Sequence, residues 1–174
     1  MSTPFPVPSH WIRRNSPNQN ARPKAVSAIV LHADAASRLD SSLDWVMRAE
    51  SRVSYHIMIG RNGAVYLVVP PERRAWHCGR SRMEGHDDVN DFSIGVCLAN
   101  RNDGVEEYSA AQYAEAMRVC TKLCQHFGIP ANRITTHALI AIPTGRKTDP
   151  RGLNLTAFQT SVDNNLRTAR PPLR

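Results

Sequence analysis

Three β-prone runs predict the strands of a sheet. Residues 25–32 (AVSAIVLH) and 92–98 (FSIGVCL) are almost continuously apolar, and residues 133–137 (RITTH) form a shorter β-branched run. Apolar runs of this length are typical of strands that are covered on both faces. We therefore expect all three runs to lie inside the sheet.

A fourth region has the pattern of a β-hairpin. Polar and apolar residues alternate from Tyr55 onward, which would place Tyr55 and His56 on opposite faces of a strand. Asn62-Gly63 follows, and residues 64–69 (AVYLVV) form the return segment. Because Asn-Gly strongly favours a two-residue hairpin turn, we expect the two segments to pair.

Helical spacing of apolar residues marks three further segments. One begins at Ser41 or Ser42, a longer one runs from Ser109 to a stop at Gly128, and the last starts near Asn154. Strands interleaved with helices indicate an α/β fold. We predict a single domain with a central mixed β-sheet flanked by helices.

Composition limits the class of protein. The chain has 174 residues, of which 41% are hydrophobic and 21% charged, as in globular domains. Residues 1–24 are rich in Pro, Asn and Arg and are expected to form an irregular arm, residues 25–168 the domain, and residues 169–174 a tail. No apolar run reaches the roughly 20 residues needed to span a bilayer. The first residues lack the apolar region of a secretion signal, so we expect synthesis in the cytoplasm.

The chain is basic, with a net charge of +7. This charge favours polyanionic partners, such as nucleic acid or an acidic wall polymer. The basic residues are scattered, however, and no nucleic-acid-binding motif accompanies them. We therefore expect no nucleic-acid partner.

Two histidines and one aspartate have the spacing of a metal site. His32 and His137 each end a predicted strand, and Asp149 follows His137 by twelve residues. If the two strands are neighbours, two imidazoles and a carboxylate meet, which is the ligand set of a catalytic zinc ion with an open fourth position. The same residues could equally be backbone-bonded histidines and a turn aspartate, so spacing alone leaves both readings open.

Longer segments resemble a known family. The matching segments, in chain order, are IVLH (29–32), VSYHIMIGRNGAVYLVV (53–69), AWHCG (75–79), NDFSIGVCLAN (90–100), ITTH (134–137) and GRKTDPRG (145–152). Together they resemble the type 2 N-acetylmuramoyl-L-alanine amidases, a family that includes phage lysozyme-type amidases, bacterial muropeptide amidases and peptidoglycan recognition proteins. The resemblance covers about residues 12 to 160, and it identifies residues 25–168 as an amidase catalytic domain.

The resemblance implies roles for five residues. It makes His32, His137 and Asp149 ligands of Zn²⁺, and it places Tyr55 and Lys147 at catalytic positions. A cation beside the metal can stabilise the oxyanion of a tetrahedral intermediate, and a phenol can orient the attacking water or the carbonyl group.

Four more residues are candidates for contacts with the glycan or the stem peptide: Trp76, His77, Asn90 and Arg146. His77 is expected at the rim, although it could instead pack under Trp76. Cys97 is a departure, because many bacterial members have a general-base Glu there. Phage members also have Cys at this position, so activity remains expected.

These features predict zinc-dependent hydrolysis of the amide between N-acetylmuramic acid and L-alanine in peptidoglycan. We expect a monomeric, phage-type endolysin that reaches the wall after the host membrane is permeabilised. The alternatives are a cytosolic amidase that recycles muropeptides and a non-catalytic peptidoglycan-binding module. In every case the partner is peptidoglycan or a muropeptide.

Overall fold

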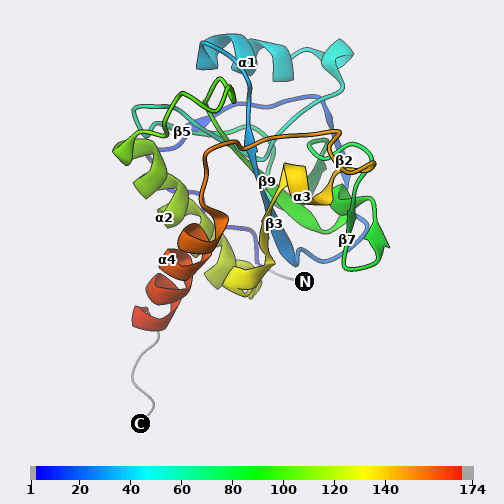
Figure 1. The fold of residues 1–174 in the computed structure, drawn as a ribbon. Coiled ribbons are helices and arrows are strands. Elements are labelled where there is room, and N and C mark those ends of the chain that lie inside the picture. Colours follow the sequence, from blue (N-terminus) through cyan, green and yellow to red (C-terminus); the bar gives the residue numbers. More distant parts are fainter. Residues whose placement is uncertain (1–2, 170–174) are drawn as a thin grey trace.

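A computed structural model describes residues 3–169 of the chain. Its centre is a six-stranded mixed sheet (Figure 1), with the strand order β1-β5-β4-β9-β3-β10. The strands of this sheet are β1 (Ile12–Arg13), β3 (Ala28–Ala33), β4 (Ile57–Ile59), β5 (Val65–Leu67), β9 (Ser93–Leu98) and β10 (Ile134–Thr136). All neighbouring pairs are parallel except the β4–β5 hairpin. The predicted α/β fold with a mixed central sheet is confirmed.

Smaller elements surround this sheet. Two-stranded ladders join β2 (Gln19–Ala21) to β6 (Arg73–Ala75) and β7 (Arg82–Met83) to β8 (His86–Asp87). The α-helices are α1 (Leu39–Val46), α2 (Ala110–Phe127), α3 (His137–Ile140) and α4 (Leu155–Thr168), and the short 3-10 helices are η1 (Ala49–Ser51), η2 (Val89–Asp91) and η3 (Ala131–Arg133). In the described residues, none of the helices is long and apolar enough to cross a membrane.

The two faces of the sheet have different coverings. Helices α2 and α4 lie side by side on one face (Figure 1), and from β3 the side chains of Ile29 and Leu31 pack into the core between them and the sheet. Because side chains alternate along a strand, Val30 and His32 point to the opposite face. That face is covered by α1, α3 and loops. Its residues are therefore placed between a rigid sheet and connecting segments.

Helix ends follow the predicted signals in two of three cases. Ser109 caps α2 by accepting a hydrogen bond from the Gln112 N–H, and Gly128 ends this helix with φ of 68°. Asn154 caps α4 in the same way. Helix α1 begins at Leu39, before the predicted Ser41 or Ser42, and Arg38 provides no side-chain cap.

The hairpin forms as predicted, but the alternation fails at Tyr55. Strand β4 begins only at Ile57, because the N–H groups of Val68 and Val69 both point at the His56 carbonyl and form a bulge. Tyr55 therefore lies outside the ladder and packs against the His32 ring, on the face to which His56 also points.

The amino-terminal segment is more ordered than an irregular arm. Within residues 1–24, β1 extends the main sheet beside β5 and β2 pairs with β6. Trp11 is buried against the core. The two strands are short and exposed, so they carry no apolar period by which the sequence could show them. Apart from Ala169, the predicted tail at 169–174 lies outside the described residues.

Candidate metal centre and active-site cleft

His32 lies on β3 and its side chain is completely buried on the loop-covered face of the sheet. Burial is the largest influence on its imidazole and lowers the pKa to about 4, so the ring is neutral at physiological pH. Its Nδ1 atom is 3.3 Å from Oδ2 of Asp149. This contact lacks hydrogen-bond geometry, and Nδ1 has no hydrogen-bond partner among the described residues.

His137 is the first residue of α3, directly after β10. Its Nε2 atom is 3.0 Å from the carbonyl oxygen of Cys78. Because a carbonyl can only accept, Nε2 carries the hydrogen, and in the neutral ring the lone pair is then on Nδ1. That lone pair faces Oδ2 of Asp149 at 3.1 Å. The sequence placed His137 at a strand end, and the structure places it one step later, at the start of a short helix.

The structure brings the three candidate ligands close together. Strand β10 pairs with β3, which brings His137 beside His32, and the Ala138 N–H binds the backbone carbonyl of Asp149 at 2.9 Å. The nearest ligand atoms of His32, His137 and Asp149 all lie within 4.8 Å of one another.

The donor set and spacing fit Zn²⁺. Lone pairs of two imidazoles directed at one carboxylate oxygen repel each other unless a cation lies between them. Contacts of 3.1 Å and 3.3 Å are close to the edge of a tetrahedron around zinc, about 3.3 Å for ligand distances of about 2.0 Å. A cation at this point would also explain why Nδ1 of His32 has no hydrogen-bond partner among the described residues. Two nitrogens and one oxygen leave the fourth tetrahedral position open.

A cavity of about 510 Å³ opens beside these ligands, and we call it the site cavity. Its lining includes His137, Asp149, Tyr55 and Lys147. Tyr55 contacts the His32 ring with centroids 5.1 Å apart, and burial raises the pKa of its phenol, so the phenol stays protonated and can donate a hydrogen bond. The predicted catalytic pair therefore borders the predicted ligands.

Lys147 and Cys97 differ in their access to solvent. Lys147 is exposed and forms no ion pair with the described residues, so its ammonium group is free to meet a developing negative charge. Cys97 is completely buried on β9, and burial raises the pKa of its thiol. A protonated, buried thiol is neither a nucleophile nor a general base.

All four predicted substrate contacts line the site cavity, and the polar groups of three of them already have partners within the chain. Trp76 donates from Nε1 to Asn20 at 2.7 Å. Asn90 is buried, and its Oδ1 accepts from two backbone N–H groups at 3.1 Å and 2.9 Å. Arg146 donates to the carbonyl groups of Cys78, Arg80 and Ile142. Asn90 and Arg146 thus hold the loops that form the cavity.

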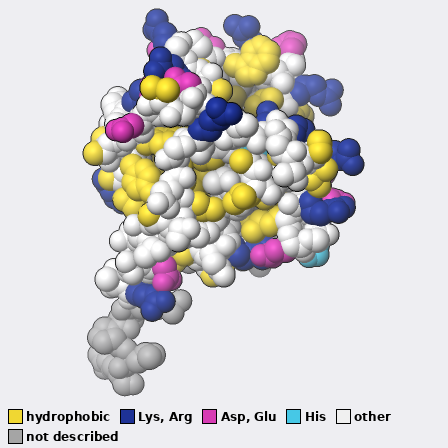
Figure 2. All heavy atoms as spheres, in the orientation of Figure 1, with side chains coloured by type: hydrophobic (Ala, Val, Ile, Leu, Met, Phe, Trp, Pro, Cys, Tyr) yellow, Lys and Arg dark blue, Asp and Glu magenta, His cyan; other side chains and the backbone are white. Residues whose placement is uncertain are grey.

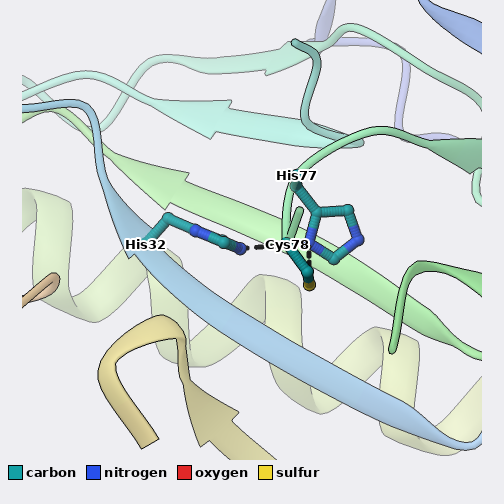
Figure 3. A group of neighbouring side chains, drawn as sticks. All are labelled: His32, His77 and Cys78. Atoms are coloured by element: carbon teal, nitrogen blue, oxygen red, sulfur yellow. Dashed lines mark hydrogen bonds between the residues drawn. The ribbon is translucent and has the colours of Figure 1, made fainter. Parts of the chain in front are cut away.

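The fourth, His77, also lines the site cavity, but it is only 5% exposed and its ring lies against the His32 ring rather than at an open rim. Its ring contacts His32, with Nδ1 of His77 3.0 Å from Nε2 of His32 (Figure 3). Residues around it were missed from the sequence: Ser93, Gly95 and the carbonyl group of Cys78. Gly95 gave the one available signal, because a glycine inside a strand often marks a close approach.

The fold and this site define the class of protein to which the chain belongs. A family model described as N-acetylmuramoyl-L-alanine amidase matches residues 22–152, which contain every candidate site residue. The chain belongs to this family. The resemblance stated from sequence motifs is thereby confirmed.

Particular relatives refine this placement. The chain is 40% identical over 102 residues to the 1,6-anhydro-N-acetylmuramyl-L-alanine amidase AmpD of Citrobacter freundii, a match covering 59% of this chain and 52% of AmpD. It is 30% identical over 146 residues to the N-acetylmuramoyl-L-alanine amidase AmiD of Escherichia coli, covering 76% of this chain and 51% of AmiD. The chain thus spans about half the length of the curated relatives it matches.

Solved structures agree on the fold. A selenomethionine derivative of AmpD superposes with a TM-score of 0.74 at 27% identity, covering 92% of this chain and 98% of that chain. A mutant endolysin from Bacillus subtilis has a TM-score of 0.68 at 18% identity, covering 87% and 97%. At that lower identity the endolysin shares the fold, and the likeness carries no further weight.

Proposed function

We propose that this protein hydrolyses the amide bond between N-acetylmuramic acid and L-alanine in peptidoglycan fragments, with Zn²⁺ held by His32, His137 and Asp149. The observation that carries the proposal is the convergence of these three buried ligand atoms beside an open cavity. Membership of the amidase family supports the same reaction.

The chemistry divides between the metal and the chain. When bound, Zn²⁺ supplies a Lewis acid that polarises a carbonyl group and makes a water molecule more acidic. Lys147 stabilises the negative charge that develops on the carbonyl oxygen, and the protonated phenol of Tyr55 orients the reacting groups. Cys97 takes no proton, and the two histidines hold the pKa of Asp149 well below its usual range, so Asp149 is a weak base and acts as a ligand.

The preferred substrate is a soluble anhydro-muropeptide rather than the intact wall. The relatives that match at 34% to 40% identity are named as 1,6-anhydro-N-acetylmuramyl-L-alanine amidases. The endolysin likeness, at 18% identity, supports the fold alone. We therefore favour the muropeptide-recycling alternative over the endolysin expected from the sequence.

Charge distribution is compatible with a small ligand. On the face shown in Figure 2, the Lys and Arg side chains of the described residues are spread out, with Asp and Glu among them. A duplex or wall polymer that binds mainly through charge would favour a continuous basic surface. Lys147 and Arg146 contribute positive charge at the site cavity itself.

The test is digestion of two substrates, a purified anhydro-muropeptide and intact sacculi, each with and without a chelator. Mass spectrometry should show release of the stem peptide from the anhydro-muropeptide, faster than from sacculi, and the chelator should abolish it. Release that continues in the chelator would contradict the metal centre. Binding of the fragment without any release would instead identify a non-catalytic module.

A further inference from the structure

A row of buried polar groups leads away from His32 on the side opposite Asp149. Nε2 of His32 is 3.0 Å from Nδ1 of His77 (Figure 3), and Nε2 of His77 is 3.5 Å from Oγ of Ser93. Ser93 in turn lies 2.6 Å from the carbonyl oxygen of Val89. His32 and Ser93 are completely buried and His77 is 5% exposed.

The carbonyl group at the end of this row decides where each hydrogen lies. The Val89 carbonyl can only accept, so Ser93 spends its single hydrogen there and can only accept from His77. A buried imidazolium without an anion beside it is costly, so His77 is neutral and has one hydrogen, on Nε2. Its Nδ1 then accepts from Nε2–H of His32, and Nδ1 of His32 is left with a lone pair directed at Asp149.

Cys78, the residue after His77, fixes the position of the hydrogen on His137 in the same way. The Cys78 carbonyl accepts from Nε2–H of His137 at 3.0 Å, which leaves Nδ1 of His137 free on the Asp149 side. Asn90 holds this dipeptide, because its Oδ1 accepts from the N–H groups of both His77 and Cys78. One anchored dipeptide therefore contacts the far nitrogen of both histidines.

We propose that His77 is a positioning residue of the metal centre, which holds His32 in the tautomer that presents Nδ1 as a ligand, with Ser93 setting the tautomer of His77. The proposal rests on the metal centre of the proposed function. Partners on the far nitrogen of a ligating histidine orient the ring and raise its basicity, and their loss typically weakens metal binding by about 10- to 100-fold.

A competing reading makes the same residues a second metal site. Sγ of Cys78 lies 3.1 Å from Nδ1 of His77, so His32, His77 and Cys78 could be three ligands. That site would need a thiolate, yet the thiol is completely buried and burial raises its pKa. It would also need His32 to give up the hydrogen on Nε2 while Nδ1 binds the first ion. The hydrogen-bond row requires neither step.

Four variants of the full chain test the proposal: His77→Leu, His77→Asn, Ser93→Ala and Cys78→Ala. The readouts are Zn²⁺ affinity from competition with a chelating dye, and the ¹⁵N shifts of the His32 ring in metal-free protein. Asn at position 77 keeps an acceptor near the place of Nδ1, whereas Leu keeps only the bulk. Cys78→Ala removes the thiol and leaves the row intact.

We expect His77→Leu to weaken Zn²⁺ binding by about 10- to 100-fold and to remove the preference for hydrogen on Nε2 of His32. His77→Asn should restore most of the Zn²⁺ affinity and most of the tautomer preference. Ser93→Ala should lose part of each, and Cys78→Ala should match wild type in both. If His77→Leu does not fold, the Ser93→Ala and His77→Asn results decide.

Opposite results are distinguishable. Wild-type affinity in His77→Leu with an unchanged His32 tautomer would overturn the proposal, as would an unchanged tautomer in Ser93→Ala if the Leu variant cannot be made. Two bound zinc ions in wild type, one of them lost in Cys78→Ala, would establish the second site instead. A wild-type protein that binds no zinc would refute the proposed function, while the ring shifts of the metal-free protein would still test the tautomer.

Discussion

The ring of His77 lies directly on the backbone of Gly95. A Cβ atom on Gly95 would be 2.6 Å from Cγ of His77, well inside van der Waals contact. Gly95 is central in β9, where its register partner on β3 is Val30. The sheet therefore has a gap in its side-chain layer, and the ring that contacts His32 fills it.

Gly95→Ala should displace the His77 ring. Overpacking in a well-packed interior costs about 1–3 kcal/mol, so we expect a lower free energy of unfolding by urea. Because the His77 ring cannot move without losing its contact with His32, Zn²⁺ affinity should fall as well. The double variant Gly95→Ala/His77→Asn, with a smaller side chain at 77, should be less destabilised than the sum of its single changes. Strict additivity would show that the methyl group and the ring do not meet.

Tyr55→Phe should lower kcat by about 10- to 100-fold, the range expected when a group that orients reactants is lost. The phenyl ring keeps the packing against His32, so Zn²⁺ binding and thermal stability should stay near wild type. Tyr113→Phe is the matched control, because Tyr113 packs against Phe158 away from the site cavity. Rates on a purified muropeptide would decide, and equal rates for both variants would remove Tyr55 from the mechanism.

Lys147→Ala should lower kcat by about 100- to 1000-fold, as expected for loss of a group that stabilises an oxyanion, with Zn²⁺ still bound. The exposed Lys122 on α2, outside the site cavity, provides the control Lys122→Ala, which removes the same charge elsewhere. A rise in KM with kcat unchanged would assign Lys147 to substrate binding instead.

The sequence predicted most of the fold because strands, helix ends and turns follow local rules. Buried parallel strands are apolar, helix ends have caps, and Asn-Gly makes hairpins, so β3, β9, α2 and the β4–β5 turn were found. The candidate ligands came instead from the family resemblance, through GRKTDP downstream of two histidines. The strand, cap and turn signals depend on neighbours along the chain.

The predicted positions of Tyr55 and His77 were wrong because both depend on contacts between distant segments. Tyr55 left the alternation because a bulge at Val68 and Val69 takes up the His56 carbonyl group, thirteen and fourteen residues beyond Tyr55 in sequence. His77 was expected at the rim as a substrate contact, with packing under Trp76 as the alternative. The His77 ring is buried because it fills the space over Gly95 and its Nδ1 atom contacts Nε2 of His32. Neither contact can be read from the sequence near position 77.

A last prediction concerns the loop that precedes α2. Glu106 accepts hydrogen bonds from Nε and Nη2 of Arg61 at 2.8 Å and 2.7 Å, which joins this loop to the hairpin turn. The hydrogen bond from Arg61 lowers the pKa of Glu106 below its ordinary value of 4.5. A lowered pKa in the folded state means that the charged pair stabilises the fold above pH 4.5, and that this stability is lost as the pH falls below that value.

Glu106→Gln should therefore destabilise the protein at pH 7 and have a smaller effect at pH 3, because the stability that the charged carboxylate supplies is lost as the pH falls below 4.5. The pair keeps solvent contact, with 34% and 20% of the side chains exposed, so the loss should be no more than about 1 kcal/mol. That corresponds to a fall in Tm of about 2–4 °C. Thermal melts at both pH values, with Glu50→Gln as an exposed control, would test this. An equal fall at both pH values would mean that packing, rather than charge, links Glu106 to Arg61.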